Sequence, residues 1–236
     1  MAQAGLHALS GVAVGKVVSR REWFFLGLIL GTVFPDLDNY VVAAATIAKL
    51  DTHGLHRTFT HSLFTILAVM VIFFLISRML QQPRWANLGL GLGAGIGMHI
   101  ALDLLIWFNS VELLWPLGGW VNLWEDIQPP AWFATLLQPL ELLFLALYFG
   151  WLGKTARNYG TNLDFLGTLR VWTILMVVFL LVFTPLAFIM GQRFLIIFGV
   201  VYLISITAAV VITVRMRQTV EAWPPEQSVQ PATLAK

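Results

Sequence analysis

The sequence predicts an all-α protein, a polytopic transmembrane helical bundle with about seven membrane segments, and two observations support this. Hydrophobic residues make up 58% of the 236-residue chain and charged residues only 11%, whereas a soluble domain is about one-quarter charged. In addition, five apolar runs have close to the roughly 20 residues that a helix needs to cross a bilayer. They lie at about 62–80, 86–108, 131–153, 169–190 and 194–214.

Weaker helical segments are predicted around these runs. Residues 4–19 and 22–34 suit two further helices, and the second is expected to stop at Pro35 because a proline nitrogen cannot donate a helical hydrogen bond. Residues 39–50 are expected to form a short helix at the membrane interface. The proline-rich tail, residues 218–236, predicts a disordered cytoplasmic segment.

No internal repeat or linker divides the rest of the chain, so residues 1–217 are expected to form a single transmembrane domain. Within it, the candidate site occupies about 1–120, and generic spans fill about 131–217. The net charge of +2 comes from scattered basic residues at segment ends, which does not indicate a nucleic-acid partner.

Basic residues predict the orientation, because cytoplasmic loops of membrane proteins are enriched in Lys and Arg. An outside N-terminus and an inside C-terminus give the best fit. Of the 14 Lys and Arg residues in the chain, this orientation leaves only Lys49, Arg57 and Arg193 outside. Residues 109–130 contain no Lys or Arg but several Trp, as expected for an outer loop beside an interfacial aromatic belt.

Histidine and aspartate residues gather at the ends of the apolar segments. They are His7, Asp36, Asp38, His56, His61, His99 and Asp103. Such side chains are costly inside a membrane and are usually functional there, so metal ligation is the simplest single explanation. Because the chain has no cysteine, any metal must be held by nitrogen and oxygen ligands.

The depth of these residues predicts one site. A helix rises about 1.5 Å per residue, which places His7, Asp36, His61 and His99 about 20–26 Å from the cytoplasmic ends of four different segments. That layer is near the outer boundary of a roughly 30 Å hydrocarbon core. Glu141 falls in the same layer. The topology came from the basic residues alone, so this agreement is independent of it.

Each pair also has a purely structural explanation. His99 and Asp103 are four residues apart, so they share a helix face and can chelate an ion, or they can make interhelical hydrogen bonds without one. Asp36 or Asp38 can cap the helix that follows. A lone histidine such as His7 is more often a structural hydrogen bonder than a ligand.

The motif HRTFTHS, residues 56–62, supplies further candidates. Thr60 is a plausible N-cap for the next helix, which would put His61 in its first turn. The Arg57 guanidinium suits phosphate oxygens, and Arg57 or Thr58 could stabilise charge on a reacting phosphoryl group; otherwise Arg57 is an ordinary exposed cation. His53 is expected to be a solvated loop residue.

Glu141 stands inside an apolar run, just after Pro139. It could be a metal ligand or a general base. It could equally be a protonated acid that is bonded to a neighbouring helix.

These motifs together resemble the YdjM-like family of LexA-regulated inner-membrane proteins. The matching pieces are His7, PDLD at 35–38, HRTFTHS at 56–62, HIALD at 99–103 and LLWP at 113–116. The resemblance covers roughly residues 5–120, and it implies metal-dependent hydrolase activity. The family more often has Gly where Thr58 stands here, which affects no candidate ligand. The family is distantly similar to zinc-dependent phospholipase C, which favours phosphoester chemistry by analogy.

The sequence therefore predicts a metal-dependent hydrolase in the prokaryotic inner membrane, with its site near the extracytoplasmic face. The expected cofactor is one or two Zn²⁺ ions, with Mn²⁺ or Fe²⁺ possible, and the expected nucleophile is a metal-activated water. A phosphoester of a lipid or lipid-linked molecule is the expected substrate. Two other classes remain open: a metal-ion or proton transporter using the same cluster, and a non-catalytic scaffold with a structural metal.

Overall fold

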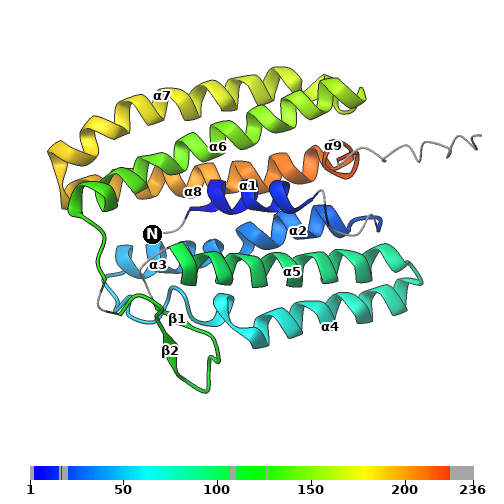
Figure 1. Ribbon diagram of the computed structural model, residues 1–236, viewed down its shortest axis with the longest axis horizontal. Helices are drawn as coiled ribbons and strands as arrows, with labels where there is room; N and C mark the ends of the chain where they lie inside the picture. Colours follow the sequence, from blue (N-terminus) through cyan, green and yellow to red (C-terminus); the bar gives the residue numbers. More distant parts are fainter. Residues whose placement is uncertain (1–2, 16, 18–20, 107–109, 126, 224–236) are drawn as a thin grey trace, which may run out of the picture.

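The computed structural model describes residues 3–15, 17, 21–106, 110–125 and 127–223, which form a helical bundle (Figure 1). The α-helices are α1 (Ala4–Val14), α2 (Phe24–Val33), α3 (Asn39–Ile47), α4 (Leu63–Leu80), α5 (Pro83–Ile106), α6 (Ala131–Tyr159), α7 (Leu166–Met190), α8 (Gln192–Arg215) and α9 (Arg217–Glu221). The 3₁₀ helices are η1 (Phe34–Asp38), η2 (Phe59–His61) and η3 (Leu163–Phe165). Strands β1 (Val111–Glu112) and β2 (Trp120–Val121) pair antiparallel.

Six helical stretches of the described residues are long and apolar enough to cross a membrane, which confirms the predicted membrane bundle. They are Phe24–Ile47, Leu63–Leu80, Pro83–Ile106, Ala131–Tyr159, Leu163–Met190 and Ile196–Arg215. Helix α1 is apolar but shorter, and it packs between α2 and α6. The predicted N-out, C-in orientation stays a prediction.

Helix α2 ends at Val33, just before Pro35, as predicted, but the chain continues through η1 into α3 as part of one membrane span. Pro35 lies at the start of the 3₁₀ helix, where its missing N–H would have no helical partner in any case. The short predicted helix at 39–50 is present as α3, but it extends the span of α2 rather than standing alone. This turn in mid-span carries Asp36 and Asp38 into the bundle.

Two other boundaries differ from the prediction. Helix α6 runs on to Tyr159, past the expected end near residue 153. The tail was predicted to be disordered from residue 218, yet residues 217–221 form α9; residues 224–236 lie outside the described part. The Glu221 carboxylate accepts hydrogen bonds from the amides of Trp23 and Leu26, both at 2.8 Å. A carboxylate at a helix N-terminus is favourable, so α9 anchors the start of α2.

Glycine contacts bring α2 and α5 together. A Cβ atom at Gly91 would lie 2.1 Å from the Phe24 carbonyl oxygen, and one at Gly95 would lie 2.2 Å from that of Leu28. Such small residues allow helix backbones to touch in a membrane. The close approach fixes the register of α5 against α2 and η1, so His99 meets the backbone of Thr32.

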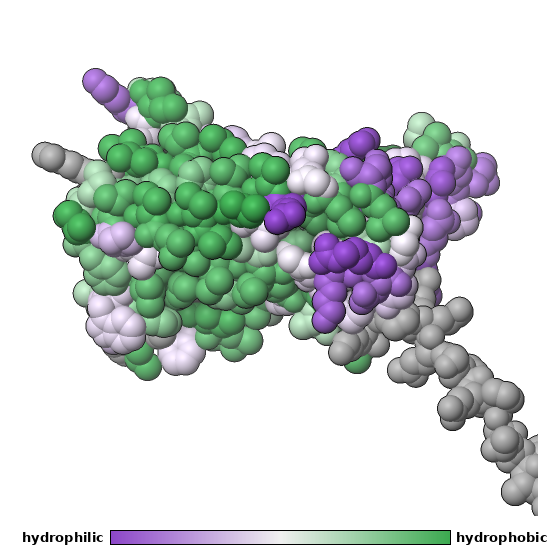
Figure 2. All heavy atoms as spheres, turned by 90° about the horizontal axis from the view of Figure 1, so that it is seen from above, coloured by the Kyte–Doolittle hydropathy of each residue, from purple (hydrophilic) through white to green (hydrophobic). Residues whose placement is uncertain are grey.

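The bundle exposes apolar side chains along its length. Helices α4 and α7 bury the smallest fractions of their spans, so they present most of their surface to lipid. Figure 2 shows apolar side chains over most of one long face, whereas polar side chains gather at the end where α9 lies. The carboxyl end of α5 and the start of α4 lie at the opposite end (Figure 1).

The β-hairpin holds the loop that carries the HRTFTHS motif. The Glu112 amide donates to the Arg57 carbonyl oxygen at 2.9 Å, and the Leu63 amide donates to that of Leu113 at 2.9 Å. Trp115 and Trp120 of the hairpin are exposed, which fits the predicted aromatic belt. The loop and hairpin thus form one unit at the end of the bundle where α4 begins.

Candidate metal centre

Seven His and Asp side chains, which include every metal ligand predicted from the sequence, converge in one cluster. They form three overlapping groups in which the ligand atoms lie within 4.8 Å of one another: His7, His99 and Asp103; Asp36, His61 and His99; Asp38, His56 and His61. They come from α1, η1, the loop before η2, η2 itself and α5. That they bind a metal stays a prediction.

His61 and His99 form the centre of the cluster, and both are fully buried. The His99 Nδ1–H donates to the Thr32 carbonyl oxygen at 2.8 Å. Thr60 donates its hydroxyl proton to Asp38 at 2.8 Å, so it accepts from the His61 Nδ1–H at 2.9 Å. In both rings Nδ1 therefore carries the proton, and Nε2 is left with a lone pair.

These two Nε2 atoms lie 3.1 Å apart. Two lone pairs at that distance repel each other unless a cation, either a proton or a metal ion, lies between them. Two nitrogen ligands of one tetrahedral Zn²⁺, each with a bond of about 2.0–2.1 Å, are about 3.3–3.4 Å apart. The imidazoles are therefore spaced as ligands of one ion.

Two carboxylates flank these imidazoles. Asp103 Oδ2 lies 3.5 Å from His61 Nε2 and 3.7 Å from His99 Nε2, and Asp36 Oδ1 lies 3.8 Å from His99 Nε2. These distances exceed those of hydrogen bonds but suit neighbouring ligands of one ion. Asp36 is 1% exposed, and neither of its oxygens has a hydrogen-bond partner among the described residues. A buried carboxylate without partners is costly, and a bound cation removes that cost.

His7 extends the cluster on the α1 side. Its Nε2 lies 3.3 Å from Asp103 Oδ1, and its ring stacks on that of His99 at 3.8 Å between centroids. Because Asp103 faces His7 with one oxygen and His61 with the other, it could bridge two ions. Neither ring nitrogen of His7 makes a hydrogen bond within the described residues.

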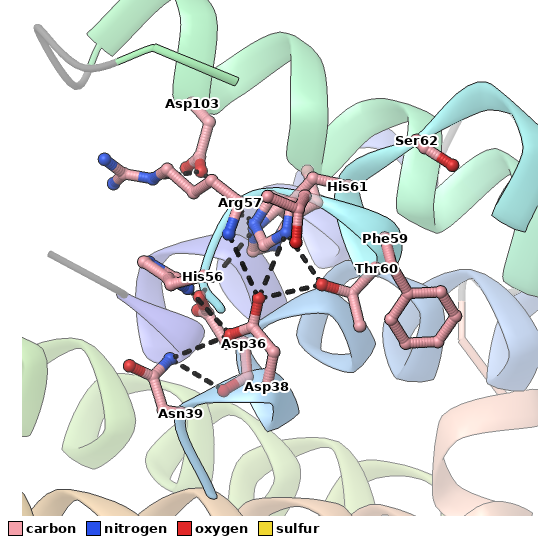
Figure 3. Close-up of polar contacts among 12 residues, drawn as sticks. Asp36, Asp38, Asn39, His56, Arg57, Phe59, Thr60, His61, Ser62 and Asp103 are labelled. Carbon is pink, nitrogen blue, oxygen red and sulfur yellow. Dashed lines mark hydrogen bonds and ion pairs between the residues drawn. The ribbon is translucent and has the colours of Figure 1, made fainter. Parts of the chain in front are cut away.

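Asp38 has different surroundings from Asp36, because its oxygens accept several hydrogen bonds. They come from His56 Nδ1 at 2.7 Å, Thr60 Oγ1 at 2.8 Å and the Arg57 amide at 3.2 Å. Figure 3 shows Asp38 where these contacts meet. Burial lowers the pKa of His56, and the bond to Asp38 opposes that shift. Asp38 thus orients His56 and His61 in the way that outer carboxylates orient metal-bound histidines.

Thr60 therefore does not cap α4, contrary to the prediction. The N-cap is Ser62, whose hydroxyl accepts from the Thr65 amide at 3.2 Å. His61 accordingly lies in η2 rather than in the first turn of α4. Thr60 and Ser62 both precede α4, and the Thr60 hydroxyl binds the carboxylate of Asp38 instead of capping the helix.

Arg57 is the one cation of the described residues that contacts the cluster. It is 6% exposed, and its Nε lies 3.3 Å from Asp103 Oδ2; Figure 3 shows the side chain extended toward Asp103. Its φ of 63° is unusual for a residue other than glycine. Nε faces Asp103 in this ion pair, whereas Nη2 has no partner among the described residues, so one donor remains for an anion.

The charges of the cluster favour a divalent cation. Asp36, Asp38 and Asp103 are buried together, and the Arg57 guanidinium beside Asp103 is the nearby cation. When ionised, the three carboxylates exceed this cation by two negative charges. Buried charges are stable only when they are paired or bind metals, so one divalent ion would neutralise the site.

Other predicted residues lie outside these groups. Glu141 accepts from the Gly5 amide with both oxygens at 3.0 Å, so it holds the start of α1. Thr58 is buried but donates to the Gly54 carbonyl oxygen at 2.9 Å, within its own loop. Their catalytic roles stay predictions. His53 is exposed, as expected.

Tyr202 of α8 is a residue that the sequence reasoning missed. Its side chain is 6% exposed, and its hydroxyl interacts electrostatically with Asp36, Glu141 and Asp38. A tyrosine in an apolar span gives no signal by itself. Only the packing of α8 against α1, α2 and α3 brings it to the cluster.

A large cavity lies elsewhere. It has a volume of about 690 Å³ between α7 and α8 and contains no His or acid. Its walls include Tyr40, Trp172 and Ala208, and Arg215 lies at the end of α8. The cavity shares no residue with the cluster, so it does not define the candidate site.

Comparison with known proteins supports the resemblance of the motifs. A family model described as YdjM inner membrane protein matches residues 1–218. No similar protein was found among the curated proteins or the solved structures. The match extends beyond the motifs through α8, so it covers the C-terminal spans as well as the cluster.

Proposed function

The chain belongs to the YdjM inner membrane protein family, and we propose that it is a metal-dependent hydrolase of the inner membrane. The observation that carries the proposal is the pair of imidazole Nε2 atoms of His61 and His99, which lie 3.1 Å apart and are flanked by Asp36 and Asp103. Two His and two Asp side chains form a nitrogen and oxygen ligand set, which suits Zn²⁺, with Mn²⁺ or Fe²⁺ as alternatives.

A bound cation of this kind lowers the pKa of water and polarises a phosphoryl oxygen. The side chains of the site have separate tasks. Asp38 and Thr60 hold the His61 ring in its tautomer, and the Thr32 carbonyl oxygen does the same for His99. Arg57 offers an unpaired guanidinium donor, Nη2, and a guanidinium group suits phosphate oxygens.

We propose a phosphoester of a lipid or a lipid-linked molecule as the substrate. The cluster lies between the η1 turn of the first span, the start of α4 and the C-terminal end of α5. Its predicted depth in the membrane is the level of the lipid headgroups. His56, whose side chain is 23% exposed, marks the more open side of the cluster. The predicted similarity to zinc-dependent phospholipase C is consistent with this substrate class, and so is the donor set of Arg57.

Metal content tests the first part of the proposal. The full-length protein, purified in detergent, should hold Zn²⁺, Mn²⁺ or Fe²⁺ by elemental analysis. His61→Ala and Asp103→Ala should lose the metal, whereas His53→Ala, a histidine of the same loop region that is exposed, should keep it. Wild-type protein that binds none of these metals would overturn the proposal.

Turnover tests the second part. The metal-loaded protein should hydrolyse phosphoesters in a screen of phospholipid and polyprenyl phosphate substrates, and chelation should abolish the activity. The complete burial of His7, His61 and His99 favours a second candidate, a scaffold stabilised by a structural metal. Tight metal binding without hydrolysis of any substrate would support the scaffold.

A further inference from the structure

Unsatisfied polar atoms concentrate around the cluster. Among the described residues, most of the buried side-chain nitrogen and oxygen atoms without a hydrogen bond occur on His7, Asp36, His56 and Arg57. The Tyr202 hydroxyl on α8 belongs to the same set. Native proteins leave few buried polar atoms without a hydrogen bond, so each such atom needs an explanation, such as a bound ligand.

Tyr202 differs from the other hydroxyl residues of α8. Ser205, Thr207 and Thr213 each donate to the carbonyl oxygen four residues earlier in the helix. Such bonding satisfies short hydroxyl side chains within a span. The long phenol of Tyr202 cannot reach back in this way, so its hydroxyl must find a partner in the bundle.

Asp36 is the acceptor available to it. Glu141 also lies near the hydroxyl, but both of its oxygens accept from the Gly5 amide. Asp38 accepts from His56, Thr60 and the Arg57 amide. Asp36 has no bond to either oxygen, and it interacts with Tyr202 although no hydrogen bond of normal geometry is formed.

We propose that Tyr202 is a positioning residue of the metal site, which donates a hydrogen bond to Asp36 when that carboxylate binds the cation. This inference rests on the proposed function. The carboxylate needs one oxygen for an ion beside His61 and His99, and the phenol hydroxyl can hold the other. The C-terminal spans would then contribute directly to a site whose ligands all lie before residue 104.

The test compares Tyr202→Phe with Tyr148→Phe in the full-length protein. Both residues are buried tyrosines, but the Tyr148 hydroxyl already has a partner, Thr213 Oγ1 at 2.7 Å. Titration with Zn²⁺ and with Mn²⁺ gives the affinity of each variant, and thermal unfolding in the presence of chelator gives the stability of the metal-free state.

Tyr202→Phe should bind metal about 10-fold more weakly, because loss of an outer hydrogen bond to a ligand costs about 10–100-fold in affinity. Its metal-free stability should be unchanged or higher, because the variant removes a hydroxyl that lacks a partner. Tyr148→Phe should show the reverse, with a lower melting temperature and unchanged affinity. A merely structural Tyr202 would lower stability without changing affinity, and that result would overturn the inference.

A double variant with Asp36→Asn tests whether Tyr202 affects metal affinity through Asp36. If Tyr202 acts through Asp36, adding Tyr202→Phe to Asp36→Asn should weaken metal binding no further. A further loss of equal size would show that the hydroxyl acts elsewhere. Wild-type protein that binds no metal overturns the proposed function, whereas equal affinities of wild type and Tyr202→Phe overturn only the role of Tyr202.

Discussion

Asp36 and Asp38 stand two residues apart in η1, but their surroundings give them opposite roles. Asp36 is buried without hydrogen-bond partners among the described residues, whereas Asp38 accepts from His56, Thr60 and the Arg57 amide. The first arrangement suits a metal ligand, because a bound cation would compensate the buried charge. The second suits a carboxylate that orients the histidines.

The two asparagine variants should therefore behave differently. Asp36→Asn should bind metal much more weakly but keep or gain metal-free stability, because it removes an unpaired buried charge. Asp38→Asn should lose about 1–3 kcal/mol of metal-free stability, since it leaves buried donors unpaired. It should keep a site that is about 10–100-fold weaker. Metal titration and unfolding with chelator measure both effects, and identical behaviour of the two variants would contradict this division.

Arg57 is expected to act on the substrate rather than on the metal. Arg57→Lys keeps the positive charge beside Asp103 but loses the planar fork for phosphate oxygens. We expect the metal content to stay at the wild-type level and phosphoester turnover to fall roughly 100-fold, as on loss of one donor to a transition-state oxygen. A variant that loses metal and activity together would instead assign Arg57 to charge balance within the site.

Sequence reasoning found the seven clustered residues because ionisable side chains are rare in apolar segments, and each therefore stands out. It could not separate Asp36 from Asp38, since their roles depend on contacts from the loop at 54–62. It also assigned the cap of α4 to Thr60, because Thr and Ser are both favoured N-caps and only the fold shows that Asp38 binds the Thr60 hydroxyl. The residue types thus predict where the site lies, whereas the role of each side chain depends on its tertiary contacts.

At the scale of helices, the apolar runs predicted the membrane spans but not the connections between helical segments. Length and composition are local, so α4, α5, α7 and α8 could be placed from the sequence alone. The passage from α2 through η1 into α3 could not, because Pro35 is compatible with both an end and a new start. Helix α9 was missed for a similar reason: its Glu221 has a partner only in the folded protein, at the start of α2.

The glycines of α5 that contact α2 should determine the position of the metal-site residues on α5. A Cβ at Gly95 would lie 2.2 Å from the Leu28 carbonyl oxygen, whereas one at Gly97 would first meet Ile66 at 3.7 Å. Gly95→Ala should therefore cost about 1–3 kcal/mol through overpacking and weaken metal binding, because α5 carries His99 and Asp103. Gly97→Ala should be neutral or stabilising by about 0.5–1 kcal/mol.

Thermal unfolding and Zn²⁺ titration of the two alanine variants check this expectation. The substitutions are two residues apart on one helix, so a general effect of alanine on α5 would appear in both. Equal losses in the two variants would mean that the close approach of α2 and α5 does not set the geometry of the cluster.

At the scale of the whole molecule, the two ends of the bundle have different chemistry. The cluster, the β-hairpin and its exposed Trp115 and Trp120 lie at the end where α4 begins. Polar side chains gather at the end where α9 lies (Figure 2). The distribution of Lys and Arg predicts that this second end faces the cytoplasm, and the substrate proposal depends on that assignment.

Because the chain has no cysteine, single cysteines can test the orientation directly. Glu125→Cys lies after the hairpin and Asp164→Cys lies in the turn between α6 and α7; both positions are exposed acids at opposite ends of α6. A membrane-impermeant maleimide should label the first in intact cells and the second only after lysis. Both variants should keep wild-type metal content, since neither residue contacts the cluster. The reverse labelling pattern would leave the metal centre intact but move it to the cytoplasmic face, where the substrate would be a lipid of the inner leaflet.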